Sequence, residues 1–243
     1  MTIQADAAPP VRTARIAGLA YLYIIFAGLF AEIGVRGRLV DYNDPVSTAA
    51  NILGSELLYR FGFVAELIMT GADILVALCL YRLLLVVDRY VSLAGMVFRL
   101  ISAAIAGTKA LFFLMPLVLL HMNPEAGGFA AGELERLSLL SLKLHGQAYN
   151  ISLVFFGMDC LIIGWLIWES GFLPRLIGAG IVVAGVCYLI TSFMIFLTPA
   201  LASSDWFMIL FLPCLIAEAA LAIWLTVRGI NAEAWKKAAG AGA

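Results

Sequence analysis

The stretch that decides the fold is residues 174–198, which read PRLIGAGIVVAGVCYLITSFMIFLT. Beyond Arg175 the stretch contains no charged side chain. An α-helix needs about 20 mostly apolar residues to cross the hydrocarbon core of a bilayer. Pro174 fits the start of such a helix, because proline is tolerated in the first helical turn. The stretch therefore predicts a membrane-spanning helix.

The composition of the whole chain agrees with this prediction. Hydrophobic residues make up 63% of the 243 residues and charged residues only 13%, about half of what a soluble domain carries. The mean hydropathy is +1.02. The net charge of −1 and the absence of a basic run argue against a nucleic-acid partner. The chain is expected to be an integral membrane protein whose main partner is the lipid bilayer.

The predicted fold class is an all-α integral membrane protein, a six-transmembrane-helix bundle. Residues 14–230 form the bundle, between a disordered N-terminal tail (1–13) and a C-terminal tail (231–243). The first apolar run is not a signal peptide, because it is long and lacks a small-residue cleavage site. The expected spans are residues 15–35, 57–87, 91–122, 138–168, 174–198 and 206–228.

A short amphipathic segment is expected after the first span. Asp44 is followed by Pro45, and this pair is typical of a helix cap and the first residue of a helix. We expect this short helix to lie along the membrane surface.

Basic residues in the short connections predict the orientation, because cytoplasmic connections carry more Lys and Arg. Eight lie on the side shared by both termini and five on the other, which favours cytoplasmic termini. The eight are Arg12, Arg15, Arg82, Arg89, Arg175, Arg228, Lys236 and Lys237, and the five are Arg36, Arg38, Arg60, Arg136 and Lys143.

Nine ionisable side chains interrupt the apolar segments or lie at their ends. A charge near the centre of a bilayer costs about 2.5–3.5 kcal/mol on insertion scales, so such groups usually face a partner or a wet cavity. Residues seven apart share a helix face, which aligns Glu66 with Asp73. The nine are Glu32, Arg60, Glu66, Asp73, Arg99, Lys109, His145, Asp159 and Glu218.

Counting about 1.5 Å per residue along alternately directed helices divides these residues by depth. Asp73, Arg99, Asp159 and Glu218 fall near the middle of the bilayer. The expected pairs are Asp73 with Arg99, and Glu66 or Glu32 with Lys109. Residues expected in the outer half are Glu32, Arg60, Glu66, Lys109 and His145.

Asp159 and Glu218 are left without an evident cation at their depth. A carboxyl group without a partner in a low-dielectric interior tends to take up a proton, so both are candidates for proton uptake or ligand binding. Alternatively, buried pairs such as Asp73–Arg99 only fix the packing of helices.

His145 has three possible roles. It is an interfacial histidine bonded to backbone, a proton acceptor over a cavity, or part of a metal site with Glu32 and Glu66. No short-range ligand motif supports a metal site, and none is predicted.

Neither the cysteines nor the known catalytic motifs point to a particular chemistry. The four cysteines fall in four different segments without a C-x-x-C pair, so free buried thiols are expected. No P-loop, dinucleotide fingerprint, G-x-S-x-G elbow or haem attachment sequence is present.

Several strings together resemble a known family. They are ARIAGL at 14–19, GLFAE at 28–32, RFG at 60–62, AD at 72–73, HG at 145–146, LVFFG at 153–157 and SGFLPR at 170–175. The chain resembles the bacterial multi-pass membrane proteins of the domain-of-unknown-function 4386 family, over about residues 14–229. The resemblance implies a helical bundle in the bacterial cytoplasmic (inner) membrane, and it assigns no catalytic residue.

Three functions fit these observations. The first is a protein that binds or transports a small molecule or protons through a buried polar cavity. The second is an intramembrane enzyme acting on a lipid-like or quinone-like substrate, with His145 or Glu66 as general base. The third is a non-catalytic assembly or scaffold protein. The sequence assigns no cofactor and no oligomeric state. The candidate ligand-binding residues are Asp73, Arg99, Asp159, Glu218, Glu66, Glu32, Lys109 and His145.

Overall fold

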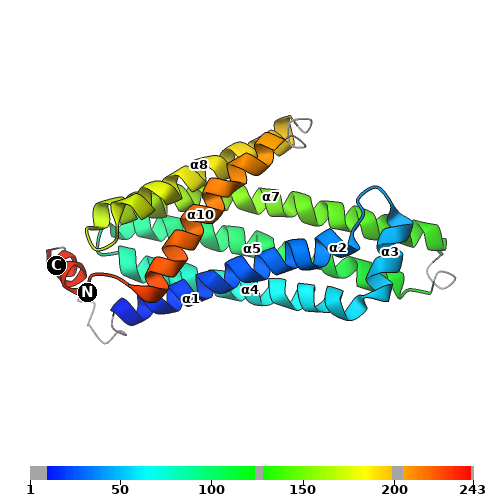
Figure 1. Ribbon diagram of the computed structural model, residues 1–243, viewed down its shortest axis with the longest axis horizontal. Helices are drawn as coiled ribbons and strands as arrows, with labels where there is room; N and C mark the ends of the chain where they lie inside the picture. Colours follow the sequence, from blue (N-terminus) through cyan, green and yellow to red (C-terminus); the bar gives the residue numbers. More distant parts are fainter. Residues whose placement is uncertain (1–9, 124–127, 199–204, 242–243) are drawn as a thin grey trace. The chain divides into compact units, whose positions relative to one another are not determined.

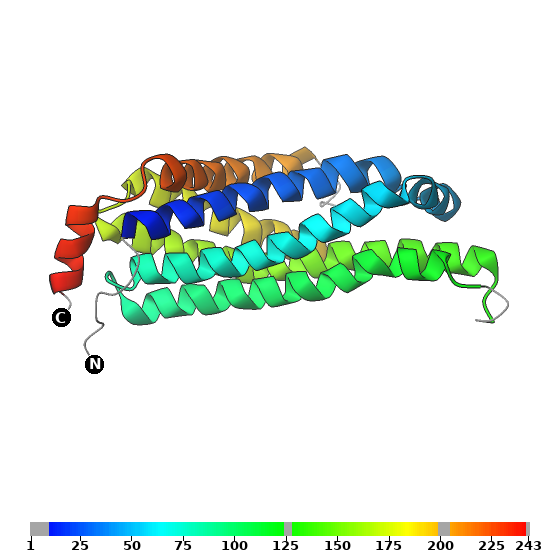
Figure 2. The same cartoon turned by 90° about the horizontal axis from the view of Figure 1, so that it is seen from below.

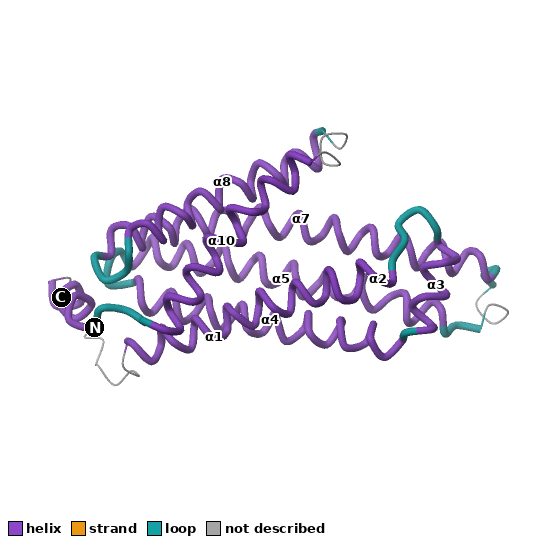
Figure 3. Tube along the Cα trace, in the orientation of Figure 1, coloured by secondary structure: helices purple, strands orange, loops and turns teal. Residues whose placement is uncertain are grey.

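The computed structural model describes residues 10–123, 128–198 and 205–241, and in these residues it is helical apart from the connections (Figures 1 and 3). No strand occurs among the described residues. The helices are α1 (Pro10–Leu29), the π-helix η1 (Phe30–Arg36), α2 (Gly37–Leu39), α3 (Pro45–Gly54), α4 (Glu56–Leu84), α5 (Arg89–Leu120), α7 (Ala131–Ser170), α8 (Arg175–Leu197), α10 (Asp205–Val227) and α11 (Ala232–Ala241).

Six of the helical stretches are long and apolar enough to cross a membrane. This finding confirms the predicted all-α membrane protein with six spans. The stretches are Pro10–Leu39, Glu56–Leu84, Arg89–Leu120, Gly132–Ser170, Arg175–Leu197 and Ile209–Val227.

Two helices begin earlier than hydropathy indicates. Helix α7 starts at Ala131, seven residues before the expected span. The Glu133 carboxylate accepts a hydrogen bond from the Ala130 N–H at 2.8 Å, which stabilises this polar first turn. Helix α1 starts at Pro10, inside the tail expected to be disordered, and residues 1–9 of that tail lie outside the described residues. A hydropathy pattern does not detect polar helical turns that flank a span.

The chain divides into two compact units, which are described separately below. Helices α1, α4, α5 and α7 contribute residues to both. Unit 1 contains Met1–Tyr23, Ala72–Ala103 and Ile151–Ala243, and unit 2 contains Ile24–Gly71 and Ala104–Asn150.

Unit 2 contains the short helix α3, which confirms the predicted capped helix. The Asp44 carboxylate accepts hydrogen bonds from the N–H groups of Val46 and Ser47, and Pro45 is the first helical residue. In Figure 1, α3 runs crosswise to the neighbouring end of α4.

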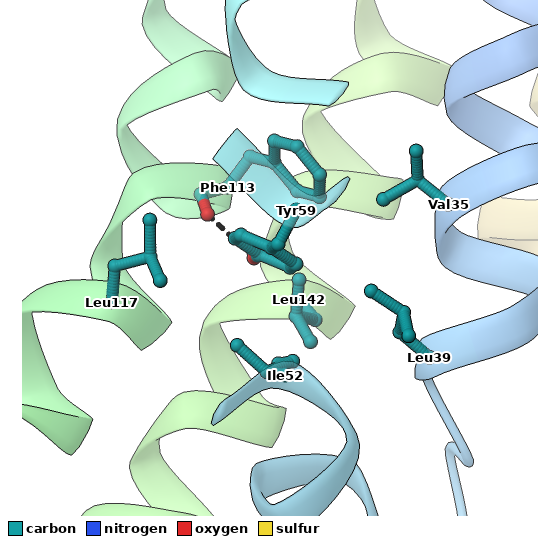
Figure 4. Close-up of a cluster of buried hydrophobic side chains, with 7 residues drawn as sticks. All are labelled: Val35, Leu39, Ile52, Tyr59, Phe113, Leu117 and Leu142. Atoms are coloured by element: carbon teal, nitrogen blue, oxygen red, sulfur yellow. Dashed lines mark hydrogen bonds between the residues drawn. The ribbon is translucent and has the colours of Figure 1, made fainter. Parts of the chain in front are cut away.

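The apolar core of unit 2 packs against α3, which contributes Ile52 to it (Figure 4). Tyr59 and Phe113 stack with their ring centroids 4.5 Å apart, and the Tyr59 hydroxyl donates to the Phe113 carbonyl at 2.6 Å. That carbonyl lies in the turn before Pro116, a proline inside α5. The other members of the core are Val35, Leu39, Ile52, Leu117 and Leu142.

In unit 1, glycines bring α7 and α8 into backbone contact. A Cβ atom on Gly164 would lie 2.7 Å from the Gly178 carbonyl oxygen, and one on Gly178 would lie 2.7 Å from the Gly164 carbonyl oxygen. Gly157 and Gly185 repeat this arrangement one heptad along each helix, at 3.1 and 2.8 Å. Small residues allow such close approach between membrane helices.

The glycines beside the charged residues do not have this role. A Cβ atom would meet nothing within 4 Å at Gly71, and only ordinary contacts at Gly28 and Gly107. A larger side chain would therefore fit at these three positions without separating the helices.

Helix α11 follows the last span and runs crosswise to α10 (Figure 2). Asn231 caps it by accepting from the N–H groups of Glu233 and Ala234, both at 3.1 Å. The Trp235 indole N–H donates to the Leu83 carbonyl at 2.9 Å. These bonds give helical structure to most of the expected C-terminal tail.

Candidate functional site

Arg99 lies at the centre of a buried cluster in unit 1. It extends from α5 between a carboxylate on α4 and another on α7. Its Nε donates to Asp73 Oδ1 at 2.8 Å, its Nη2 is 2.7 Å from the same oxygen, and its Nη1 donates to Asp159 Oδ2 at 3.0 Å. Arg99 is 2% exposed and Asp159 1% exposed. We call Asp73, Arg99, Asp159 and Glu218 the Arg99 cluster.

Aromatic rings cover the Arg99 guanidinium. Its central carbon lies 4.8 Å from the centroid of the Tyr21 ring and 5.0 Å from that of the Phe156 ring. Both rings are buried. Cation–π contacts at these distances stabilise a guanidinium that has left water, so the cation is held in one place.

Glu218 joins the cluster through two tyrosines. The Tyr188 hydroxyl of α8 donates a hydrogen bond to its carboxylate. Tyr21 lies close enough to both Glu218 and Arg99 to interact electrostatically with their charges. Among the described residues, no cation lies within ion-pairing distance of Glu218.

The charges of the Arg99 cluster do not balance. One arginine faces three carboxyl groups, of which Asp159 and Glu218 are fully buried and the side chain of Asp73 is 16% exposed. The second oxygen of Asp159 has no hydrogen-bond partner within the described structure. It faces Gly95, where an added Cβ atom would lie 3.4 Å from it.

The structure corrects one prediction about this cluster. The Asp73–Arg99 pair is present as expected, but Asp159 is not without a cation, because it shares Arg99 with Asp73. A guanidinium presents donors on several edges and can serve two carboxylates at once. The sequence-based prediction assumed that each cation pairs with one carboxylate, so it did not include the sharing of Arg99. Glu218 does lack a cation among the described residues, as predicted.

Unit 2 contains a second buried cluster, centred on Glu66 of α4. Arg36 Nη1 donates to Glu66 Oε1 at 2.5 Å. His145 Nε2 and Lys109 Nζ lie 3.1 and 3.2 Å from Glu66 Oε2. Glu66, Lys109 and His145 are each 2% exposed. We call these four residues, together with Glu32, the Glu66 cluster.

Arg36 is the functional-site residue that sequence reasoning missed. It was assigned to the first outer connection, but the π-helix η1 continues the helix and ends at Arg36, which is buried. Arg36 also donates to Glu32 at 2.5 Å, while the Glu32 side chain remains 65% exposed. The four-residue spacing of Glu32 and Arg36, typical of a helical ion pair, was the available signal.

Lys109 and His145 are held on several sides. Lys109 Nζ and His145 Nε2 are 3.4 Å apart. The Lys109 ammonium also lies 5.2 Å from the centroid of the Tyr149 ring. The His145 ring packs 5.4 Å from the Phe113 ring. His145 is therefore bonded to a side chain and is not an interfacial histidine bonded only to backbone.

Three further ionisable residues of unit 2 lie near its surface. Arg60 pairs with Glu56 at 2.6 Å, and His121 lies 3.2 Å from the same carboxylate. Two surface pockets also lie in this unit, with volumes of about 140 and 360 Å³. Neither is lined by a member of the two charged clusters.

All four cysteines are free and buried, as predicted. Across the described ranges, no three His, Cys, Asp or Glu side chains are placed to hold a metal ion together.

Asp73, Arg99, Asp159 and Glu218 belong to unit 1, and Glu32, Arg60, Glu66, Lys109 and His145 belong to unit 2. The depth of these residues in a bilayer stays a prediction.

Comparison with known proteins identifies relatives without an assigned activity. A family model described as "Domain of unknown function (DUF4386)" matches residues 16–229. A protein of Archaeoglobus fulgidus named "Uncharacterized protein" is 26% identical over 169 residues, which cover 70% of this chain and 84% of that protein. No solved structure matches the chain.

Proposed function

The chain belongs to the domain-of-unknown-function family DUF4386, and we propose that it is a multi-pass membrane transport protein that binds protons in its interior. The proton-binding groups are the carboxyls of the Arg99 cluster. The proposal rests on one observation, the single arginine that faces three carboxyl groups inside a membrane-spanning unit.

The charge imbalance supports proton binding for an energetic reason. Three ionised carboxylates beside one guanidinium would leave two uncompensated negative charges in a low-dielectric interior, which is strongly unfavourable. Taking up protons removes this cost without a further cation. Asp159 and Glu218 are the preferred positions, because Asp159 has an oxygen without a donor and Glu218 has no described cation within ion-pairing distance.

Hydroxyl groups lie beside Glu218. Tyr188 donates to Glu218, and Tyr21 lies beside both Glu218 and Arg99, which binds Asp159. Other titratable groups that face these carboxyls are the thiols of Cys160 and Cys214.

The Glu66 cluster fits a different role. Its one buried carboxylate accepts from Arg36, His145 and Lys109, so its charge is already compensated. Such a network holds helices in register, which supports the scaffold alternative for this part of the chain. The enzyme alternative has less support, because a carboxylate engaged by three cationic or donor groups is a poor general base.

We place the protein in the cytoplasmic membrane with both termini in the cytoplasm. The six candidate spans support termini on one side. The excess of Lys and Arg in the connections on that side supports the cytoplasmic assignment.

Proton movement through purified protein in liposomes tests the proposal. A potassium gradient with valinomycin makes the interior negative, and a trapped pH-sensitive dye reports acidification. The wild-type protein is expected to acidify the interior faster than empty liposomes do, and Asp159→Asn and Glu218→Gln are expected to return the rate to that of empty liposomes.

Glu169→Gln is the matched control, since it removes an exposed carboxylate from the same helix as Asp159. It should keep the wild-type rate. A wild-type rate equal to that of empty liposomes would overturn the proposal, as would an equal loss in Glu169→Gln.

A further inference from the structure

The smaller surface pocket of unit 2 combines cationic and apolar groups. It has a volume of about 140 Å³ and lies between the first residue of α3 and the outer face of α7. Its lining residues are Pro45, Arg136, Leu139, Leu140 and Lys143.

The two cations of this pocket are available for a ligand. Arg136 and Lys143 are both exposed, and neither forms an ion pair with another described residue. Being seven residues apart, they lie on one face of α7, about 10 Å apart along its axis. Both side chains are long enough for their ends to approach the same anionic group.

The same face of α7 is apolar beside the cations. Leu140 is 51% exposed and Leu144 is 42% exposed. These side chains belong to a chain with six candidate spans, so lipid is available to cover them. Cations beside exposed leucines match the two parts of a phospholipid, a phosphate and an acyl chain.

The larger surface pocket is a weaker candidate for an anion. It has a volume of about 360 Å³ and its lining includes Leu53, Leu120 and Leu134. However, the Glu135 carboxylate also lines it, and this charge would repel a phosphate.

We propose that the pocket between α3 and α7 binds an anionic phospholipid of the surrounding membrane. Arg136 and Lys143 hold the phosphate, and an acyl chain lies along Leu140 and Leu144. The choice of ligand rests on charge complementarity, because an arginine and a lysine on one helix face attract an anionic phosphate. This site is independent of the Arg99 cluster and does not rest on the proposed proton binding.

Native mass spectrometry of the purified full-length chain tests this site. Phosphatidylglycerol and phosphatidylcholine of equal chain length are titrated separately into the detergent solution. We expect the wild-type protein to retain phosphatidylglycerol preferentially, and the double variant Arg136→Gln with Lys143→Gln to weaken its binding roughly 10- to 30-fold.

The double variant Arg38→Gln with Arg60→Gln is the matched control. It removes two exposed arginines from the same unit and lowers the net charge equally. Wild-type binding in this control supports the site. Equal weakening in both double variants would overturn it, and so would equal retention of the two lipids by the wild-type protein.

A separate titration with glycerol phosphate distinguishes a lipid from a soluble phosphate. Glycerol phosphate carries the head-group charge without acyl chains. Failure to displace bound phosphatidylglycerol supports a lipid that also uses the leucines. Displacement at concentrations equal to those of the lipid would overturn the assignment of a lipid ligand.

Discussion

At the scale of single residues, Arg99 explains why Asp73 and Asp159 are tolerated inside the protein. Its guanidinium donates to both, and the rings of Tyr21 and Phe156 replace the water that it has lost. Removing one partner of a buried charged network leaves the others uncompensated, which costs more than removing the whole network.

Replacing Arg99 alone should therefore be strongly destabilising. We expect Arg99→Met to lower the free energy of unfolding by about 3–5 kcal/mol, measured by denaturation in detergent. Combining it with Asp73→Asn and Asp159→Asn should restore most of the loss. Arg89→Met removes an exposed arginine of the same helix and should have little effect. A single variant as stable as the wild type would contradict the central position of Arg99.

Only part of the two charged clusters could be predicted from the sequence. The pairing of Asp73 with Arg99 follows from their depth on neighbouring helices. The second bond of Arg99 to Asp159, and the inward turn of Arg36, depend on distances between helices and on a π-helical turn. The bond to Asp159 leaves no pattern in the sequence. The four-residue spacing of Glu32 and Arg36 indicates their ion pair but not the burial of Arg36.

At the scale of helices, the close approach of α7 and α8 depends on facing glycines. Gly164 and Gly178 leave no room for a methyl group between the two backbones. Their heptad spacing with Gly157 and Gly185 was visible, but the identity of the partner helix was not.

Gly164→Ala should separate α7 from α8. Because the added methyl group would overlap backbone atoms, we expect a loss of about 1–3 kcal/mol in unfolding free energy, measured as a lower melting temperature in detergent. Gly146→Ala lies in the same helix with nothing within 4 Å of the new atom, and it should be neutral or stabilise by up to about 1 kcal/mol. Equal effects of the two changes would argue against the contact.

The cap of α3 gives a dependence on pH. The Ser47 hydroxyl and the N–H groups of Ser47 and Val46 donate to Asp44, and these bonds lower the pKa of its carboxyl below the ordinary value. A lowered pKa means that the cap stabilises α3 fully above the pKa of the unfolded chain. This stabilisation is lost as the pH falls through the lowered, folded-state pKa.

Hydrogen-exchange protection of the α3 amides, corrected for the intrinsic exchange rate, should therefore fall on acidification. Asp44→Ala should show low protection at all pH values, and Asp44→Asn should keep protection without the pH dependence, since asparagine also caps helices. Equal pH profiles for Asp44→Asn and the wild type would show that another group is responsible.

At the scale of the whole molecule, the number of spans was predictable while their full lengths were not. Each span contains an apolar core that hydropathy detects. The polar first turns of α7 and the helical start of α1 at Pro10 extend beyond these cores. Caps and local hydrogen bonds stabilise such turns, and hydropathy does not register them.

The topology can be tested with introduced cysteines, because the four native thiols are buried. Asp41→Cys lies in the connection after the first span and Lys237→Cys in α11. We expect a membrane-impermeant maleimide to label Asp41→Cys in intact cells and Lys237→Cys only after permeabilisation. The reverse pattern would place the termini outside.

The central claim is that at least one of the three carboxyls in the Arg99 cluster carries a proton at neutral pH. Infrared spectroscopy of the purified protein in lipid reports this directly, through the carbonyl stretch of a protonated carboxylic acid. We expect this band in the wild type and in Glu169→Gln, and we expect it to weaken in Asp159→Asn or Glu218→Gln. A wild-type spectrum at neutral pH that contains only ionised carboxylate bands would contradict the account.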